Sequence, residues 1–135
     1  MALWSVKRSV GKNASASTST REQGMSAEDS ALAHLEGAGL RLVDRNYRTP
    51  GRGGGEIDLV MRAAGGTLVF VEVRARSGSG HGGAAASVSA IKQQRIVFAA
   101  RHYLRRFRAP PPCRFDVVAI DGGRIQWLVG AFDAS

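Results

Sequence analysis

Residues 56–74, EIDLVMRAAGGTLVFVEVR, decide the fold of this chain. Apolar residues alternate with polar ones in both halves, and a Gly-Gly pair separates the halves, which predicts two antiparallel strands joined as a hairpin. If the turn centres on Gly65, Asp58 lies directly opposite Glu72, and both side chains point away from the face that carries the alternating apolar residues. A shift of one residue would mix polar and apolar side chains on each face, so the hydrophobic pattern favours this pairing.

The predicted pairing places two carboxylates side by side. Directly opposed Cβ atoms lie about 5 Å apart, and like charges there are destabilising unless a proton or a cation lies between them. Oxygen ligands on a rigid hairpin suit Mg²⁺ or Mn²⁺, so Asp58 and Glu72 are candidate metal ligands, with Glu56 and Arg74 beside them. The alternative is a solvated polar face, on which both acids point to water and Arg74 pairs with Glu56. Spacing alone leaves both interpretations open.

The segments around the hairpin predict a small α/β domain. A helix is expected from Ser26, a suitable N-cap followed by acids, to Gly37 or Gly39. The other predicted elements are a strand at 40–47, a flexible glycine-rich loop at 49–55, a long helix at 87–107, and strands at 114–120 and 124–129. The predicted order is therefore α-β-β-β-α-β-β.

The N-terminal stretch differs from the rest of the chain. Residues 1–24 contain Ser, Thr, Ala and basic residues without periodicity, which predicts a disordered basic tail. An upstream start assigned in place of Met25 is the alternative. Residues 25–135 are expected to form the single folded domain, because the whole chain has the length of one domain.

The charge of the chain indicates a polyanionic partner. The net charge is +8, whereas the 44% hydrophobic and 22% charged residues are ordinary for a globular protein. Residues 74–114 contain no Asp or Glu, so the basic excess belongs to the folded part. The basic residues there are Arg74, Arg76, Lys92, Arg95, Arg101, Arg105, Arg106, Arg108 and Arg114.

The cysteine content and hydropathy restrict the class of protein further. Cys113 is the only cysteine, which excludes an internal disulfide and a multi-cysteine metal site. No apolar run approaches the roughly 18 residues that span a bilayer. We therefore expect a cytoplasmic protein without a membrane segment, and the sequence leaves open whether it is a monomer or a homodimer.

The hairpin also resembles a known motif. Residues 55–60, GEIDLV, followed by residues 69–74, VFVEVR, resemble the PD-(D/E)XK hallmark of restriction-endonuclease-like proteins. With residues 45–48 (RNYR), 92–104 and 114–118 (RFDVV), they resemble the YraN-like family of small bacterial proteins, which is similar in fold to archaeal Holliday-junction resolvases. The resemblance covers nearly everything from residue 28 to residue 120. It implies a restriction-endonuclease-like core, in which helices flank a central mixed sheet.

The resemblance also implies roles for single residues. Asp58, Glu72 and the Val73 carbonyl would hold the metal, and Glu28 would match the helix-borne acid of the resolvase pattern. The alternative for Glu28 is an acid that only complements the helix dipole. The third motif residue is usually Lys, and here it is Arg74. An arginine keeps its proton and cannot act as a base, although it can hold a phosphate with two hydrogen bonds. A substitute for the missing lysine is Lys92.

Other basic residues are candidate nucleic-acid contacts. Lys92 and Arg95 lie near the predicted start of the second helix, where backbone N–H groups also favour phosphate. Arg101 and Arg105 recur at helical spacing as a basic stripe, for which an ordinary solvated face is the alternative. Arg76, at the end of the hairpin, completes the set.

Three functions remain after these observations. The leading hypothesis is a Mg²⁺- or Mn²⁺-dependent endonuclease that hydrolyses phosphodiester bonds in DNA, with branched DNA as one candidate substrate. The second is a non-catalytic nucleic-acid-binding module with the same fold, and the third is a basic adaptor for an acidic protein. Metal-dependent cleavage distinguishes the first from the others, and salt-sensitive DNA binding distinguishes the second from the third.

Overall fold

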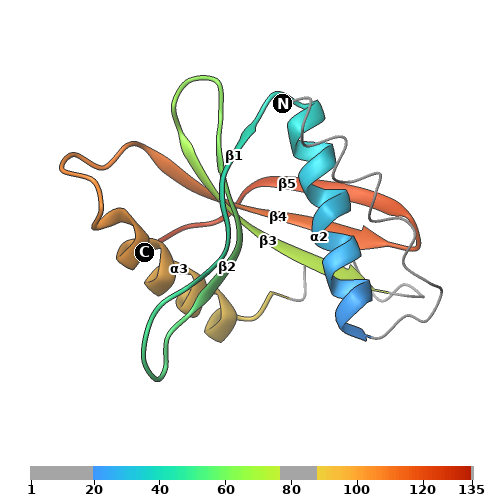
Figure 1. The fold of residues 1–135 in the computed structure, drawn as a ribbon, viewed down its shortest axis with the longest axis horizontal. Coiled ribbons are helices and arrows are strands. Elements are labelled where there is room, and N and C mark those ends of the chain that lie inside the picture. The colour runs from blue at the N-terminus through green and yellow to red at the C-terminus, as the bar shows by residue number, and fades with distance from the viewer. Residues whose placement is uncertain (1–19, 77–87, 135) are drawn as a thin grey trace.

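The computed structural model describes residues 20–76 and 88–134, and its elements follow the predicted order α-β-β-β-α-β-β. Most of the predicted tail lies outside these residues. The elements are α2 (Thr20–Gly37), β1 (Arg41–Arg48), β2 (Glu56–Arg62), β3 (Leu68–Arg76), α3 (Ala90–Leu104), β4 (Cys113–Asp121) and β5 (Arg124–Phe132). Figure 1 shows α2 and α3 on either side of the long β1–β2 hairpin. The α/β prediction is confirmed. Within the described ranges, no helix combines the length and hydropathy needed to span a membrane.

The strands form one mixed sheet of five strands in the order β1-β2-β3-β4-β5. Strands β3 and β4 are parallel, and the other neighbouring pairs are antiparallel. Parallel neighbours require a crossover connection, and here that connection contains α3. The first residues of α3 therefore follow the end of β3, where the predicted acidic residues lie.

The predicted register of the central hairpin is confirmed. Leu59 pairs with Val71 and Met61 pairs with Val69, as a turn centred on Gly65 requires. Backbone pairing of β2 with β3 ends at Leu59–Val71. The predicted acids at positions 58 and 72 thus lie just beyond the last paired residues.

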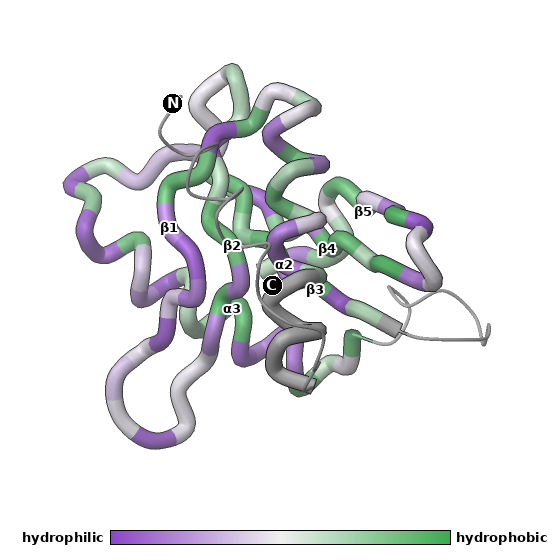
Figure 2. Tube along the Cα trace, turned by 45° about the vertical axis from the view of Figure 1, so that its right-hand side comes forward, coloured by the Kyte–Doolittle hydropathy of each residue, from purple (hydrophilic) through white to green (hydrophobic). Residues whose placement is uncertain are grey.

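The central strands are buried on both faces, which differs from the alternative of one solvated polar face. Val60 and Phe70 lie on the face opposite to the predicted apolar positions. Both are nevertheless fully buried, in a cluster with the buried residues of α3. The opposite cluster joins α2 to Leu59, Met61, Val69 and Val71. Figure 2 shows the hydrophobic segments gathered in the central strands. The polar side chains that lie within these strands, such as Glu72 and Asp116, are therefore buried as well.

The predicted starts of both helices are wrong for local reasons, and α3 also ends at Leu104 rather than at residue 107 and β5 at Phe132 rather than at residue 129. Helix α2 begins at Thr20 rather than at Ser26, because Arg, Glu, Gln and Met in residues 20–25 are good helix formers. Helix α3 begins at Ala90, after Ser89, whose side chain accepts a hydrogen bond from the Lys92 N–H. Serine at the N-cap satisfies a backbone donor that the helix itself cannot.

The glycine-rich loop after β1 is tied down at its base, although a flexible loop was predicted. The Thr49 N–H donates to the Gly55 carbonyl at 3.1 Å, and the Gly55 N–H donates to Thr49 Oγ1 at 2.8 Å. Gly55 also packs on α3, since a Cβ built there would lie 2.0 Å from the Arg95 carbonyl oxygen. The loop therefore holds a fixed position beside the start of α3.

Candidate active site

The two acids of the hairpin converge where its strands stop pairing. Asp58 lies on β2 and Glu72 on β3, and each carboxyl group changes the pKa of the other. The Val73 N–H donates to Asp58 Oδ2 at 2.8 Å, so this carboxylate takes the place of a backbone acceptor. The Glu72 side chain is only 5% exposed. The pair is therefore enclosed, and the alternative of a solvated polar face does not describe it.

Enclosure changes the acidity of both groups. The pKa of Asp58 is raised to about 7, first by burial and next by the charge of Glu72, while the hydrogen bond from Val73 lowers it. Burial also raises the pKa of Glu72, against the lowering effects of Lys92 and Arg74. Two nearby carboxylates in a poorly solvated site favour a proton or a cation between them. Perturbed acids of this kind are typical of functional sites.

Two cations lie against the same carboxylate oxygen. Lys92 Nζ is 3.6 Å and Arg74 Nη1 is 3.8 Å from Glu72 Oε2. Arg74 follows Glu72 on the same strand, whereas Lys92 comes from the first turn of α3, which Ser89 caps. The crossover helix thus brings a lysine to the acids of the hairpin.

Glu28 approaches the pair from the other helix. Its side chain is 19% exposed, and Arg45 Nη2 lies 3.7 Å from its Oε1. The pKa of Glu28 is raised, first by burial and next by the charge of Asp58. Asn46 lowers the pKa of Glu28, and its backbone is left-handed, with φ of 56°. Glu28 therefore belongs to a connected polar group, beyond any effect on the helix dipole.

The donor set fits a divalent cation of the magnesium type. In a strand, the N–H and C=O of one residue point to the same neighbour, so the Val73 carbonyl is directed to the side where Asp58 lies. Among the described residues, no group of three or more His, Cys, Asp or Glu side chains could hold a metal. The ligands would be Asp58, Glu72 and the carbonyl, and Mg²⁺ commonly uses one or two carboxylates together with water.

A family model supplies the identity of the chain. The model of the uncharacterised protein family UPF0102 matches residues 27–120, a range that includes all the residues of this site. The chain belongs to the UPF0102 family. This membership confirms the expected YraN-like family.

Named relatives of this UPF0102 chain cover most of its length. A UPF0102 protein of Albidiferax ferrireducens is 62% identical over 134 residues, which cover 99% of both chains. A UPF0102 protein of an Acidovorax species is 67% identical over 116 residues, covering 86% of this chain and 88% of the relative. A UPF0102 protein of Methylibium petroleiphilum is 66% identical over 119 residues, covering 86% and 98%. None of these names states an activity.

The predicted nucleic-acid contacts divide into two groups. Arg95 borders the same pocket as Lys92. At 3.6 residues per turn, Arg101 and Arg105 lie on the opposite side of α3 from Lys92, and Arg101 Nη2 donates to the Ala134 carbonyl at 3.2 Å. Arg76 ends β3, and its side chain is outside what the structure describes. Of these predicted contacts, Lys92 therefore lies at the acids, Arg95 lies at the adjoining pocket, and the stripe lies on the other side of the helix.

Two residues of this UPF0102 site had no predicted role. Arg45 pairs with Glu28 and with Asp29, whose Oδ1 is 3.0 Å from Arg45 Nη2. No local pattern indicates this role, because it depends on how β1 packs against α2. Asn46 did give a signal, since asparagine within a strand-like segment is one of the few residues that tolerate left-handed backbone.

Proposed function

We propose that this protein is a metal-dependent endonuclease that hydrolyses phosphodiester bonds in DNA, built on a restriction-endonuclease-like core of the PD-(D/E)XK type. The observation that carries the proposal is the enclosed Asp58–Glu72 pair with Lys92 and Arg74 on one carboxylate oxygen. Carboxylates that attract a metal ion, next to positively charged side chains that attract phosphate, are the groups that metal-dependent phosphodiester hydrolysis requires. The position of the pair at the end of a β-hairpin also supports the resemblance to Holliday-junction resolvases.

Asp58, Glu72 and the Val73 carbonyl are the proposed metal ligands. When bound there, Mg²⁺ or Mn²⁺ supplies positive charge at the phosphate and lowers the pKa of water. Arg74 can hold a non-bridging phosphate oxygen through its planar guanidinium. Glu28, which pairs with Arg45 and whose pKa the charge of Asp58 raises, would fix water on the acidic side of the site.

Lys92 is the proposed substitute for the lysine of the motif. Both Lys92 and Arg74 lie near Glu72 Oε2, but only Lys92 carries the compact ammonium charge of the motif lysine, which a planar guanidinium does not reproduce. A lysine that originates in α3 can therefore take the place that the motif gives to lysine. Arg74 would then be left with a positioning role.

A second candidate function follows from the same substitution. An arginine in the motif position permits a module that binds nucleic acid and does not cleave it. In that case the basic residues around the carboxylates would hold phosphates, and the carboxylates would only weaken the binding.

A cleavage assay tests the proposal and distinguishes it from the binding module. Labelled linear and branched DNAs are incubated with the full chain in Mg²⁺, Mn²⁺ or EDTA. We expect cleavage that requires the metal, its loss in Asp58→Ala and Glu72→Ala, and DNA binding in these variants that is unchanged or stronger. Stronger binding would follow from removal of a negative charge near the phosphate.

Two further variants assign the lysine role. Lys92→Ala is expected to abolish cleavage, while Arg74→Lys is expected to retain it or to increase the rate. If Lys92→Ala cleaves DNA and Arg74→Lys does not, Arg74 and not Lys92 has the role of the motif lysine. If the wild type cleaves no DNA with either metal, and Arg74→Lys does not rescue cleavage, the enzyme proposal is refuted and the binding module remains.

A further inference from the structure

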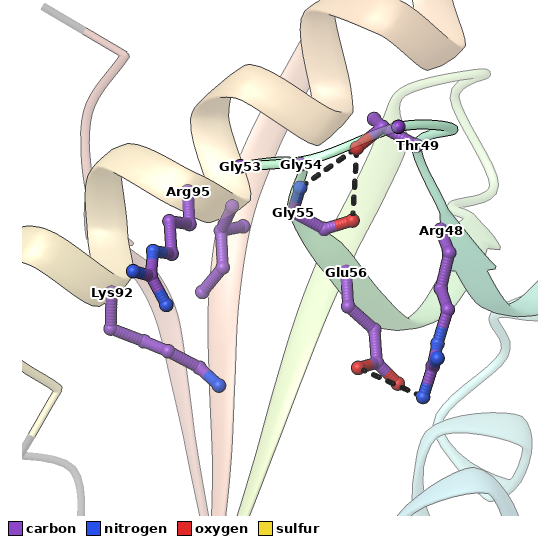
Figure 3. A pocket seen from close by; sticks show the side chains of 10 residues that line it. Arg48, Thr49, Gly53, Gly54, Gly55, Glu56, Lys92 and Arg95 are labelled. Atoms are coloured by element: carbon purple, nitrogen blue, oxygen red, sulfur yellow. Dashed lines mark hydrogen bonds and ion pairs between the residues drawn. The ribbon is translucent and has the colours of Figure 1, made fainter.

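A separate pocket of about 380 Å³ adjoins the carboxylate site. The loop that joins β1 to β2 forms one wall, and the first turns of α3 form the other. Figure 3 shows Lys92 extending from the helix toward the space that Glu56 and Arg48 border from the strands, with Arg95 beside it on the helix. We call this space the glycine-loop pocket. None of the roles discussed above uses Arg48 or the loop.

The glycine-loop pocket has a rigid wall made of backbone. Gly54 and Gly55 cannot carry side chains, since a Cβ would lie 1.9 Å from Thr49 Oγ1 at the first and 2.0 Å from the Arg95 carbonyl oxygen at the second. The buried Thr49 side chain ties the two ends of the loop together. Glycine backbone permits close approach of a ligand, so the wall is both fixed and open to contact.

The charges of the pocket favour an anion. Arg48, Lys92 and Arg95 line it against a single acid, Glu56. That acid is already offset, because Arg48 Nη2 lies 3.7 Å from Glu56 Oε1. Arg95 is exposed, and within residues 20–76 and 88–134 its side chain has no hydrogen bond or ion pair. A guanidinium without a protein partner at the edge of a pocket is available to an anionic ligand.

Lys92 connects this pocket to the carboxylates. Its ammonium lies 3.6 Å from Glu72 Oε2, and the same side chain lines the pocket. A strand that presents one phosphate to Asp58 and Glu72 would therefore pass over Lys92 toward Arg95. The volume suffices for a phosphate with its sugar, at the low end of ligand pockets.

We propose that the glycine-loop pocket binds a backbone phosphate of the nucleic-acid strand, next to the phosphodiester at the Asp58–Glu72 pair. The inference rests on the proposed function for the identity of its ligand. Arg95 and Lys92 contact this phosphate, and Arg48 closes the pocket on the far side. The pocket thereby sets the direction in which the strand crosses the site. It contributes affinity without reading base sequence.

Salt-dependent binding tests the pocket without any cleavage. Anisotropy of a fluorescein-labelled DNA oligonucleotide is measured in EDTA over a range of salt concentrations, with Arg95→Gln, Arg48→Gln and Arg41→Gln. Arg41 is the matched control, since it is exposed and begins β1 at the end opposite to Arg48. Removal of one phosphate contact lowers the slope of log K against log salt by about 1. We expect that decrease in the two pocket variants and no change in the control.

The outcomes separate this inference from the nuclease proposal. Slopes for Arg95→Gln and Arg48→Gln equal to that of Arg41→Gln would overturn the pocket, even if the wild type cleaves DNA. Lowered slopes in a protein that cleaves nothing would refute the nuclease and keep the pocket. Inorganic phosphate and a mononucleotide, titrated at constant ionic strength, identify the source of the phosphate. Displacement of the oligonucleotide by a stoichiometric amount of either would overturn the assignment to a strand.

Discussion

Replacement of Asp58 by asparagine is expected to stabilise the protein above neutral pH. The side chain keeps its shape, its oxygen still accepts the hydrogen bond that the Val73 N–H makes at 2.8 Å, and its amide can donate to Glu72. What disappears is the negative charge enclosed beside a second carboxylate. Because like charges repel strongly where water is scarce, removal of one charge favours the folded state.

The pKa of Asp58 gives the size and the sign of the effect. It is raised from 3.8 to about 7 in the folded chain, so the folded state binds this proton more tightly than the unfolded state does. The free energy of unfolding therefore decreases as the pH rises from about 4 to about 7, and is constant above that range. At about 1.4 kcal/mol per pKa unit the decrease is about 4 kcal/mol. The free energy of unfolding of a small domain is about 5–15 kcal/mol in total, so this decrease is a large part of it.

Urea unfolding followed by circular dichroism measures this difference. In EDTA at pH values from about 4 to about 8, the wild type should lose stability with rising pH, and Asp58→Asn should show a flatter profile and a higher midpoint above neutrality. The control is Asp133→Asn, at an exposed position, which should follow the wild type. A variant equal to or weaker than the wild type near pH 8 would refute the reasoning.

Added Mg²⁺ extends the same experiment to the proposed ligands. A cation that binds only the folded state raises the free energy of unfolding by about 2.7 kcal/mol at a hundredfold excess over its Kd. The wild type should be stabilised at pH 8, whereas Asp58→Asn should respond little. An equal response in both proteins would place the cation elsewhere.

Three further predictions concern stability and are measured by urea unfolding. Gly55→Ala should lower the free energy of unfolding by about 1–3 kcal/mol, because its Cβ would collide with the Arg95 carbonyl. The control Gly65→Ala has open space around its Cβ and should not lower it. Equal effects of the two substitutions would contradict the close packing of Gly55 on α3. Asp116→Ala should lower the free energy of unfolding by about 3–5 kcal/mol, since this fully buried carboxylate accepts hydrogen bonds from a guanidinium, an indole and a backbone amide. A small decrease would mean that water replaces the carboxylate. Asn46→Gly should be tolerated and Asn46→Val should cost about 1–2 kcal/mol; the reverse order would exclude left-handed backbone at this position.

The central hairpin could be predicted from the sequence because its period permits few arrangements. Alternation fixes which side chains share a face, and one Gly-Gly turn fixes the register, so the facing of Asp58 and Glu72 required no knowledge of the rest of the fold. Their burial could not be predicted in this way. It depends on α3 covering Val60 and Phe70, and that contact joins segments far apart in the chain.

The basic residues of α3 illustrate the same limit. Helical spacing groups Arg101 with Arg105 and Lys92 with Arg95, but spacing does not say which side of a helix faces the sheet. The structure decides this through Ile96, Ala99, Ala100 and Tyr103, which are buried, and Lys92 lies on the same side of the helix at its N-terminal end. The sequence named Lys92 as a candidate, and the packing of α3 gives its distance of 3.6 Å from Glu72 Oε2.

Selection for stability alone does not account for the arrangement around Asp58. A chain with a net charge of +8 encloses two carboxylates side by side, sets a third acid, Glu28, near them, and holds Asn46 in a backbone conformation that most residues avoid. Each feature lowers stability, and each is located where β1, β2 and β3 meet both helices. Strain and perturbed acids that coincide at one point are characteristic of sites kept for a ligand. If Asp58→Asn is more stable but no longer responds to Mg²⁺, the enclosed charge is explained by the cation that it holds.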